Sequence, residues 1–185
     1  PSITIPISVV SIGDSAFSLC KHLQSITIPS NVTSIGDSAF YQCYKLQSIN
    51  VEPTNLHFAS IDGILFTKDL TTIICFPSNH RFSTYNIPTS VTSIGNSAFY
   101  GCHHLQSITI PTNVTFFGDS AFFDCSKLPS ITIPSSVTSI GNSAFYQCYK
   151  LQSINVESTN LHFASIDGIL FTKDFATIIC FPSKH

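Results

Sequence analysis

The chain has 185 residues, of which 43% are hydrophobic and only 10% are charged. Ten Asp and Glu residues against eight Lys and Arg give a formal net charge of −2, which excludes a basic domain that binds nucleic acid by displacing counterions. The longest apolar runs fall far short of the ~20 residues that a membrane-spanning helix needs. Because the chain begins at Pro1 without a methionine or a signal peptide, we expect a fragment of a longer protein.

The dominant feature of the sequence is an internal repeat with a period of 23 residues. A Ser-Ile-Thr-Ile-Pro segment and a Ser-Ala-Phe segment recur at this spacing, and a glycine precedes each Ser-Ala-Phe by two positions. The first segment occupies residues 2–6, 25–29, 107–111 and 130–134, and the second occupies 15–17, 38–40, 97–99, 120–122 and 143–145. Such a period is typical of a solenoid, in which stacked copies bury side chains that no single copy could bury alone.

One repeat unit predicts, in chain order, a strand, a turn, an extended run and a helical turn. Residues 23–28 alternate apolar and polar side chains, as a half-buried strand does. Pro29 ends this strand because it cannot donate a hydrogen bond to a neighbouring strand. Residues 32–35 form a second short extended run, and residues 38–43 place their apolar side chains on one helical face. Stacking such units predicts a mainly β, right-handed solenoid with one continuous parallel sheet and short helical turns on the other side.

Two irregular segments, residues 52–84 and 157–185, depart from the period. They belong to a 105-residue super-repeat, because residues 42–80 recur as residues 147–185 with four differences. In each segment, two β-rich runs around a Thr-Lys-Asp turn predict a β-hairpin inserted in a wide coil. The alternative is that residues 73–76 join the main sheet as an extra strand. In either case, we expect the whole chain to form a single solenoid.

These motifs resemble the unit of the BspA-like leucine-rich repeat family, Leu-x-x-Ile-x-Ile-Pro-x-x-Val-x-x-Ile-Gly-x-x-Ala-Phe-x-x-Cys. The match covers nearly the whole chain, and the irregular Ile-Asp-Gly segment at residues 61–63 also resembles a hairpin segment of the family. The unit departs from the common leucine-rich repeat because it lacks the Asn-x-Leu that follows the strand. The resemblance implies a surface or secreted protein that adheres to host matrix, host cells or other microbes, and it does not specify the ligand.

Two sets of side chains are candidates for binding. The first is the outward face of the repeated strand, an uncharged row of hydroxyl and amide groups formed by Thr27, Asn50, Thr109, Thr132 and Asn155. The second is an aromatic stripe beside the helical turn, formed by Tyr41, Tyr44, Tyr100, Phe123, Tyr146 and Tyr149. Solenoids commonly bind through a sheet, and Tyr is frequent among binding hot spots. The alternatives are ordinary solvent-facing strand residues for the row and lateral packing between coils for the stripe.

The cysteines follow the repeat rather than a redox or metal-binding motif. Five of the seven occupy one slot of the unit, which favours buried free thiols over disulfides: Cys20, Cys43, Cys102, Cys125 and Cys148. Cys75 and Cys180 lie at strand positions that we expect to face outward, so they are the better candidates for reactive thiols, although we favour the alternative that they are partly covered strand residues. Since the histidines show no zinc-ligand spacing and no catalytic motif occurs, we expect no metal, no cofactor and no enzyme activity.

The array and the resemblance favour a non-enzymatic adhesion module that gains strength from many weak contacts. Its partners would be proteins or glycoproteins of a host matrix or cell surface, such as fibronectin. The alternative is a structural spacer or stalk that displays another domain. Threonines on a flat β-face also suggest ice binding, although Asn50 and Asn155 interrupt the threonine row. We further expect edge-to-edge self-association, because unpaired strands at the ends of an array can pair with other chains.

Overall fold

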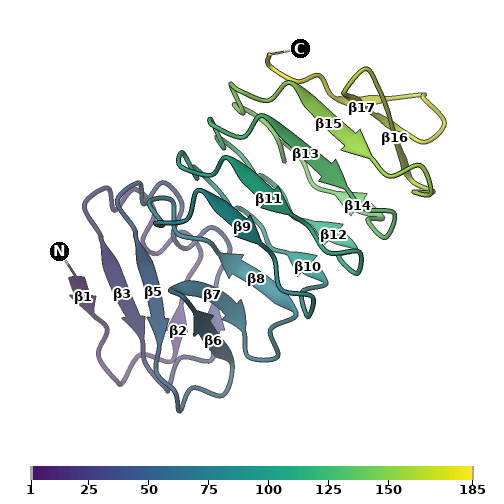
Figure 1. The fold of residues 1–185 in the computed structure, drawn as a ribbon. Coiled ribbons are helices and arrows are strands. Elements are labelled where there is room, and N and C mark those ends of the chain that lie inside the picture. The colour runs from purple at the N-terminus through teal and green to yellow at the C-terminus, as the bar shows by residue number, and fades with distance from the viewer. Residues whose placement is uncertain (1, 185) are drawn as a thin grey trace.

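The computed structural model describes residues 2–184 and shows a β-solenoid of stacked coils (Figure 1). Each coil contributes a strand to one face, here called the strand face, and most coils contribute a two-residue strand to the opposite face. The strand face holds β1 (Ser2–Thr4), β3 (Ser25–Ile28), β5 (Ser48–Val51), β9 (Thr84–Asn86), β11 (Ser107–Thr109), β13 (Ser130–Ile133) and β15 (Ser153–Val156). The opposite face holds β2 (Ser11–Ile12), β4 (Ser34–Ile35), β10 (Ser93–Ile94), β12 (Phe116–Phe117) and β14 (Ser139–Ile140).

Strands of successive coils pair in parallel at an offset of one repeat. Ser25 lies opposite Ser48, and Ser130 lies opposite Ser153. Because the pairing is in register, side chains from the same slot of the unit stack on one another through the molecule. The predicted mainly β solenoid with parallel sheets is therefore confirmed.

The strand face is divided into three sheets, with the orders β1-β3-β5, β9-β11 and β13-β15. After β5, the backbone N–H of Ile49 donates to Gly63 of the first insertion at 2.8 Å instead of pairing with the next coil. The break between β11 and β13 has a different cause. The backbone N–H of Gln106 donates to the preceding coil at 2.7 Å, but the equivalent residue in the next coil is Pro129, which has no N–H to donate. The prediction of one continuous sheet is wrong for these two local reasons.

The Ser-Ala-Phe segments form consecutive turns, and residues 2–184 contain no helix. Alternate N–H groups leave the segment: Phe99 donates to Ala121 of the next coil at 2.8 Å, whereas Tyr100 donates to Ser97 at 3.0 Å. A helix would need every N–H for bonds four residues back. The serine that opens each segment also has a positive φ, 55° at Ser97. The helical turn predicted for residues 38–43 and its copies is therefore wrong, because bonds between coils replace bonds within a helix.

Each irregular segment contains three antiparallel strands; those of the first segment join the sheet of the opposite face, and those of the second form a separate sheet. The first segment holds β6 (Phe58–Ile61), β7 (Ile64–Thr67) and β8 (Thr72–Cys75), and the second holds β16 (Phe163–Ile166), β17 (Ile169–Thr172) and β18 (Ile178–Cys180). β7 and β8 pair around the turn at Thr67–Leu70 and form the predicted hairpin, and β6 and β7 form a further hairpin with its turn at Asp62 and Gly63. β8 pairs antiparallel with β7 and parallel with β10, so it extends the sheet of the opposite face rather than that of the strand face.

The core consists of two clusters of buried side chains that meet at β7. Ile64 and Phe66 belong to the cluster that continues toward the C-terminus, while Leu65 belongs to the cluster of the first coils. Neighbouring strand residues point to opposite faces, so β7 presents apolar side chains to both clusters. This explains why the Ile-Leu-Phe run does not alternate with polar residues, since all three side chains are at most 1% exposed.

Candidate binding surfaces

The predicted row of polar side chains lies exposed along the strand face. Thr27, Asn50, Thr109, Thr132 and Asn155 are all exposed. Thr27 is paired with Asn50, and Thr132 with Asn155, so their side chains project side by side from adjacent strands. The isoleucines that alternate with them are buried, except for Ile108, which is partly buried. The structure thus provides an uncharged hydroxyl and amide surface that crosses several coils.

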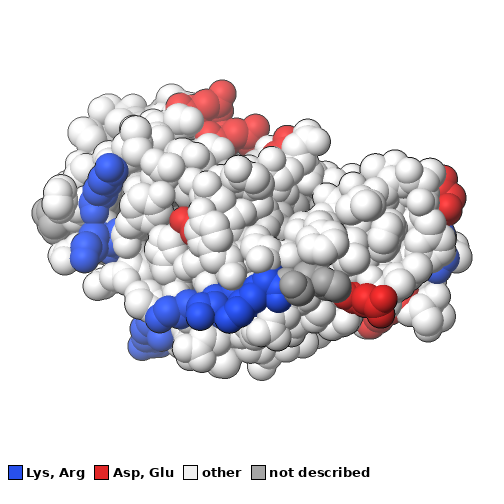
Figure 2. All heavy atoms as spheres, turned by 90° about the horizontal axis from the view of Figure 1, so that it is seen from above, with Lys and Arg blue, Asp and Glu red and all other residues white. Residues whose placement is uncertain are grey.

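The molecule carries few charged side chains. Figure 2 shows a view of the surface that is mostly uncharged, with the Lys, Arg, Asp and Glu side chains in small separate groups. Only two ion pairs join described residues, Arg81 with Asp62 at 3.5 Å and His103 with Asp124 at 3.6 Å. A partner of this surface would meet hydrogen-bonding groups rather than a strong electrostatic field.

A groove of about 740 Å³ interrupts the strand face next to β5. One wall comprises Gln47, Ser48 and Asn50, in and beside β5. The other residues come from the first insertion and the loop that follows it: Ser60, Asp62, Gly63 and residues 79–81. This groove, which we call the junction groove, was not predicted from the sequence. The signal available was the loss of the 23-residue period in this segment.

The aromatic stripe is a stack of rings that packs neighbouring coils together. Ring centroids are 4.2 Å apart for Tyr41 and Tyr100, 4.9 Å for Tyr100 and Phe123, and 5.2 Å for Phe123 and Tyr146. Tyr100 is only 5% exposed. Tyr146, at one end of the stack, is 59% exposed. The middle of the stripe therefore serves lateral packing, and its accessible part is at the end.

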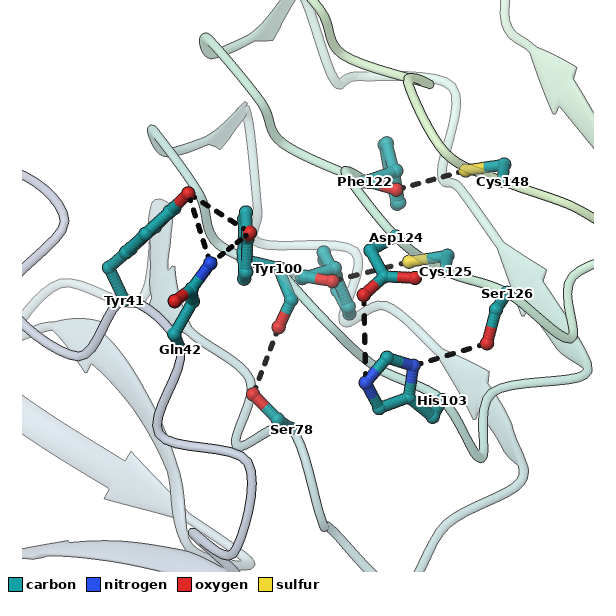
Figure 3. A network of polar contacts seen from close by, with 11 residues as sticks. Tyr41, Gln42, Ser78, Tyr100, His103, Phe122, Asp124, Cys125, Ser126 and Cys148 are labelled. Atoms are coloured by element: carbon teal, nitrogen blue, oxygen red, sulfur yellow. Dashed lines mark hydrogen bonds and ion pairs between the residues drawn. The ribbon is translucent and has the colours of Figure 1, made fainter. Parts of the chain in front are cut away.

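Hydrogen bonds hold the Tyr100 ring in place within this stack. The Tyr100 hydroxyl donates to the Tyr41 hydroxyl at 3.0 Å and accepts from Nε2 of Gln42 at 3.1 Å (Figure 3). Burial raises the pKa of Tyr100, so this hydroxyl remains a donor over the physiological range. Tyr44 lies beside the same network, with its ring 5.5 Å from that of His103. Tyr149 is 59% exposed.

A Ser, a His and an Asp side chain meet at the turns of two adjacent coils. Nδ1 of His103 lies 3.1 Å from Oγ of Ser126, and its Nε2 lies 3.6 Å from Oδ2 of Asp124 (Figure 3). Burial raises the pKa of Asp124, and the neighbouring imidazole opposes this effect. Because Asp124 and Ser126 belong to one turn and His103 to the turn before it, these contacts tie two coils together.

The repeated cysteines form a ladder of buried thiols. Sγ of Cys43, Cys125 and Cys148 donates to a phenylalanine carbonyl of the preceding coil at 3.0, 3.2 and 3.1 Å, respectively. The seven cysteines are free in the structure, and burial raises the pKa of Cys43 to about 11. These thiols act as small apolar groups that also satisfy a buried carbonyl.

The two cysteines outside the ladder do not project into solvent. Cys75 and Cys180 are half-buried and pack against the two core clusters. Burial raises the pKa of both thiols, to about 11 for Cys180. The expectation that they face outward is wrong because both side chains contact the core, Cys75 from β8 in the sheet of the opposite face and Cys180 from β18 beside β17, whereas the favoured interpretation as partly covered strand residues is confirmed.

Two buried asparagines are the structural residues that the sequence did not reveal. Asn55 and its copy Asn160 are both 0% exposed. Each donates its side-chain amide to two carbonyls of the preceding coil and accepts two backbone N–H groups at the start of the hairpin. Each asparagine thereby fixes the insertion to the coil before it.

Within residues 2–184, no three His, Cys, Asp or Glu side chains are grouped so that they could hold a metal ion. The same residues include no helix of sufficient length and apolar character to cross a membrane.

The repeat fold with these surfaces defines a leucine-rich-repeat-type solenoid. The family model described as the BspA type leucine rich repeat region matches residues 1–81 and 72–184 in six copies. The chain therefore belongs to the BspA-type leucine-rich repeat family. The search of curated proteins found no match.

Several solved structures share the fold. A leucine-rich repeat protein from Eubacterium ventriosum is 30% identical with a TM-score of 0.80, over 84% of this chain and 41% of that one. A leucine rich cell surface protein from Faecalibacterium prausnitzii is 26% identical with a TM-score of 0.57, over 86% and 54%. The pneumococcal vaccine antigen PcpA, at 24% identity and a TM-score of 0.67, shows the same fold over 86% and 51%. The chain thus spans between two fifths and just over half of these relatives.

Proposed function

We propose that the chain is a non-enzymatic adhesion module of a cell-surface or secreted protein, and that it binds proteins or glycoproteins of host matrix, host cells or other microbes. The observation that carries the proposal is the exposed row of Thr27, Asn50, Thr109, Thr132 and Asn155 across successive coils. A row of this kind lets one ligand contact several coils at once, so weak contacts add. The relative described as a leucine rich cell surface protein supports the proposed location.

The test is surface plasmon resonance of the 185-residue chain over immobilised fibronectin and a panel of matrix proteins and host-cell glycoproteins. We expect saturable binding to at least one of them. The double variant Thr109→Arg plus Thr132→Arg places two bulky charges on the row and should weaken that binding at least about tenfold.

The matched control is Thr115→Arg plus Thr138→Arg. These threonines are also exposed and one repeat apart, but they lie beside β12 and β14 on the opposite face. Equal loss of binding in both double variants would contradict a role for the strand face. Absence of binding across the panel by the folded chain would favour the alternative, a spacer that holds another domain away from the cell.

A further inference from the structure

The junction groove differs from the rest of the strand face because it is concave and belongs to the super-repeat rather than to the 23-residue unit. Its volume of about 740 Å³ lies in the ~300–1,000 Å³ range of small-molecule sites. The hairpin turn at Asp62 and Gly63 closes one side, and the loop that contains Arg81 closes another. A small ligand in the groove would therefore be contacted from several sides, whereas the flat row can contact a ligand from one side only.

The lining of the groove limits the chemistry of a ligand. None of the lining residues carries an aliphatic side chain, so the groove offers little driving force for an apolar ligand. Asp62 and Arg81 face each other at 3.5 Å, which leaves no net charge to select an anion or a cation. The remaining groups are mainly the amides of Gln47, Asn50 and Asn79, which both donate and accept hydrogen bonds. Such groups complement a neutral ligand whose own groups both donate and accept, namely a polyhydroxylated one.

The walls of the groove are held in place by contacts beneath them. Nε2 of His80 lies 2.8 Å from the Asp62 carbonyl, and its Nδ1 accepts the N–H of Phe82 at 3.2 Å, so the buried ring links the loop to the hairpin turn. A Cβ added to Gly63 would lie 2.7 Å from Cβ of Ser48, which shows how closely this turn approaches β5. The backbone of both walls is therefore held in place, which lowers the entropic cost of forming the groove.

Part of the groove lining occurs twice in the chain, although Lys184 stands in the copy at the position of Asn79. Six residues of the groove recur 105 positions later as Gln152, Ser153, Asn155, Ser165, Asp167 and Gly168. A Cβ added to Gly168 would again lie 2.7 Å from Cβ of a serine, Ser153. The arrangement of hairpin turn against strand is thus a feature that the super-repeat copies.

We propose that the junction groove is a binding site for a neutral saccharide, with the amides of Gln47, Asn50 and Asn79 and the Asp62–Arg81 pair as its hydrogen-bonding groups. The site holds no aromatic platform for a sugar ring, so we expect dissociation constants in the millimolar range for single saccharides. This proposal goes beyond the proposed adhesion to proteins and does not depend on it, because the groove can bind a saccharide whether or not the strand face binds a protein.

The experiment is an NMR titration of the ¹⁵N-labelled chain with galactose, mannose, N-acetylglucosamine and lactose, in separate samples. We expect at least one of them to shift the side-chain amide signals of Asn50 and Asn79 saturably. Asn50→Ala removes a donor and an acceptor from the wall and should weaken this binding about tenfold. Asn86→Ala is the matched control, because Asn86 is also exposed on the strand face, on β9 opposite Thr109, but does not line the groove. We expect this control to bind like the parent chain.

Three results would overturn the proposal. One is the absence of saturable shifts with every saccharide, and another is undiminished binding by the folded Asn50→Ala variant. The third is a titration in which an uncharged Gly-Ser-Gly-Ser peptide, rather than any saccharide, shifts the same amide signals, because the groove would then take a peptide. Each result is independent of the surface plasmon resonance test on proteins.

Discussion

Asn55 is the residue whose loss should most clearly separate the insertion from the coil beneath it. Its Nδ2 donates to the carbonyls of Pro29 at 2.7 Å and Val32 at 3.0 Å, and its Oδ1 accepts the N–H groups of His57 and Phe58, both at 2.8 Å. Asn55→Ala removes all these bonds. At about 1 kcal/mol net for each of the four bonds, we expect a loss of about 4 kcal/mol, or about 8–16 °C in melting temperature for a chain of this size.

Urea and thermal unfolding followed by circular dichroism measure this loss. Asn55→Asp is a second informative variant, because it retains the acceptors but replaces the two donors with a carboxylate oxygen that faces two carbonyls. We expect it to be at least as unstable as Asn55→Ala at pH 7. The control is Asn86→Ala, an exposed asparagine that should cost at most about 0.5 kcal/mol. Equal stability of Asn55→Ala and Asn86→Ala would refute the argument that these bonds hold the insertion in place.

Three further predictions concern the core, the junction and the thiols. Phe122→Ala should cost about 3–5 kcal/mol in urea melts because the ring is fully buried between two others, whereas Thr132→Ala should cost little; similar losses would contradict the inward and outward assignments. Burial lowers the pKa of His80 from its ordinary value of 6.5, so the unfolded chain takes up the proton more readily and stability should decline as the pH falls below about 6.5. His80→Gln should remove this part of the pH dependence of melting, and an unchanged profile would contradict it. Iodoacetamide should modify Cys20 but not Cys125 in the native chain, because burial raises the pKa of the Cys125 thiol; mass spectrometry of both sites measures this.

The 23-residue period was sufficient to predict which strand side chains face the core. Ile28 is 0% exposed and Thr27 is exposed, as the alternation predicts, and the same holds for Ile133 and Thr132. Stacking gives each copy of a slot nearly the same surroundings, so a pattern seen in several copies reflects one environment. The polar row could therefore be predicted residue by residue, although its role in binding stays a prediction.

Features that depend on contacts between coils were not visible in the sequence. The Ser-Ala-Phe segment has an apolar face suited to a helix, but Phe99 donates its N–H to Ala121, so the local preference is overridden by pairing with the next coil. Asn55 has no counterpart in the regular units, and nothing in the sequence distinguishes a buried asparagine from one in a loop. The junction groove likewise arises only when the hairpin turn and the loop at residues 79–81 meet beside β5.

The insertion explains how a repetitive chain can carry a localised site. In a strictly periodic coil, every strand offers the same shallow row, so a ligand is selected only by the number of coils that it contacts. The insertion brings Asp62 and residues 79–81 onto the strand face, while Leu65 and Phe66 keep the core closed beneath them, both at 0% exposure. The resulting recess adds a carboxylate and a guanidinium group, which the row lacks. We therefore expect the 105-residue super-repeat to determine which ligand is selected. The number of 23-residue units should determine how strongly the chain adheres.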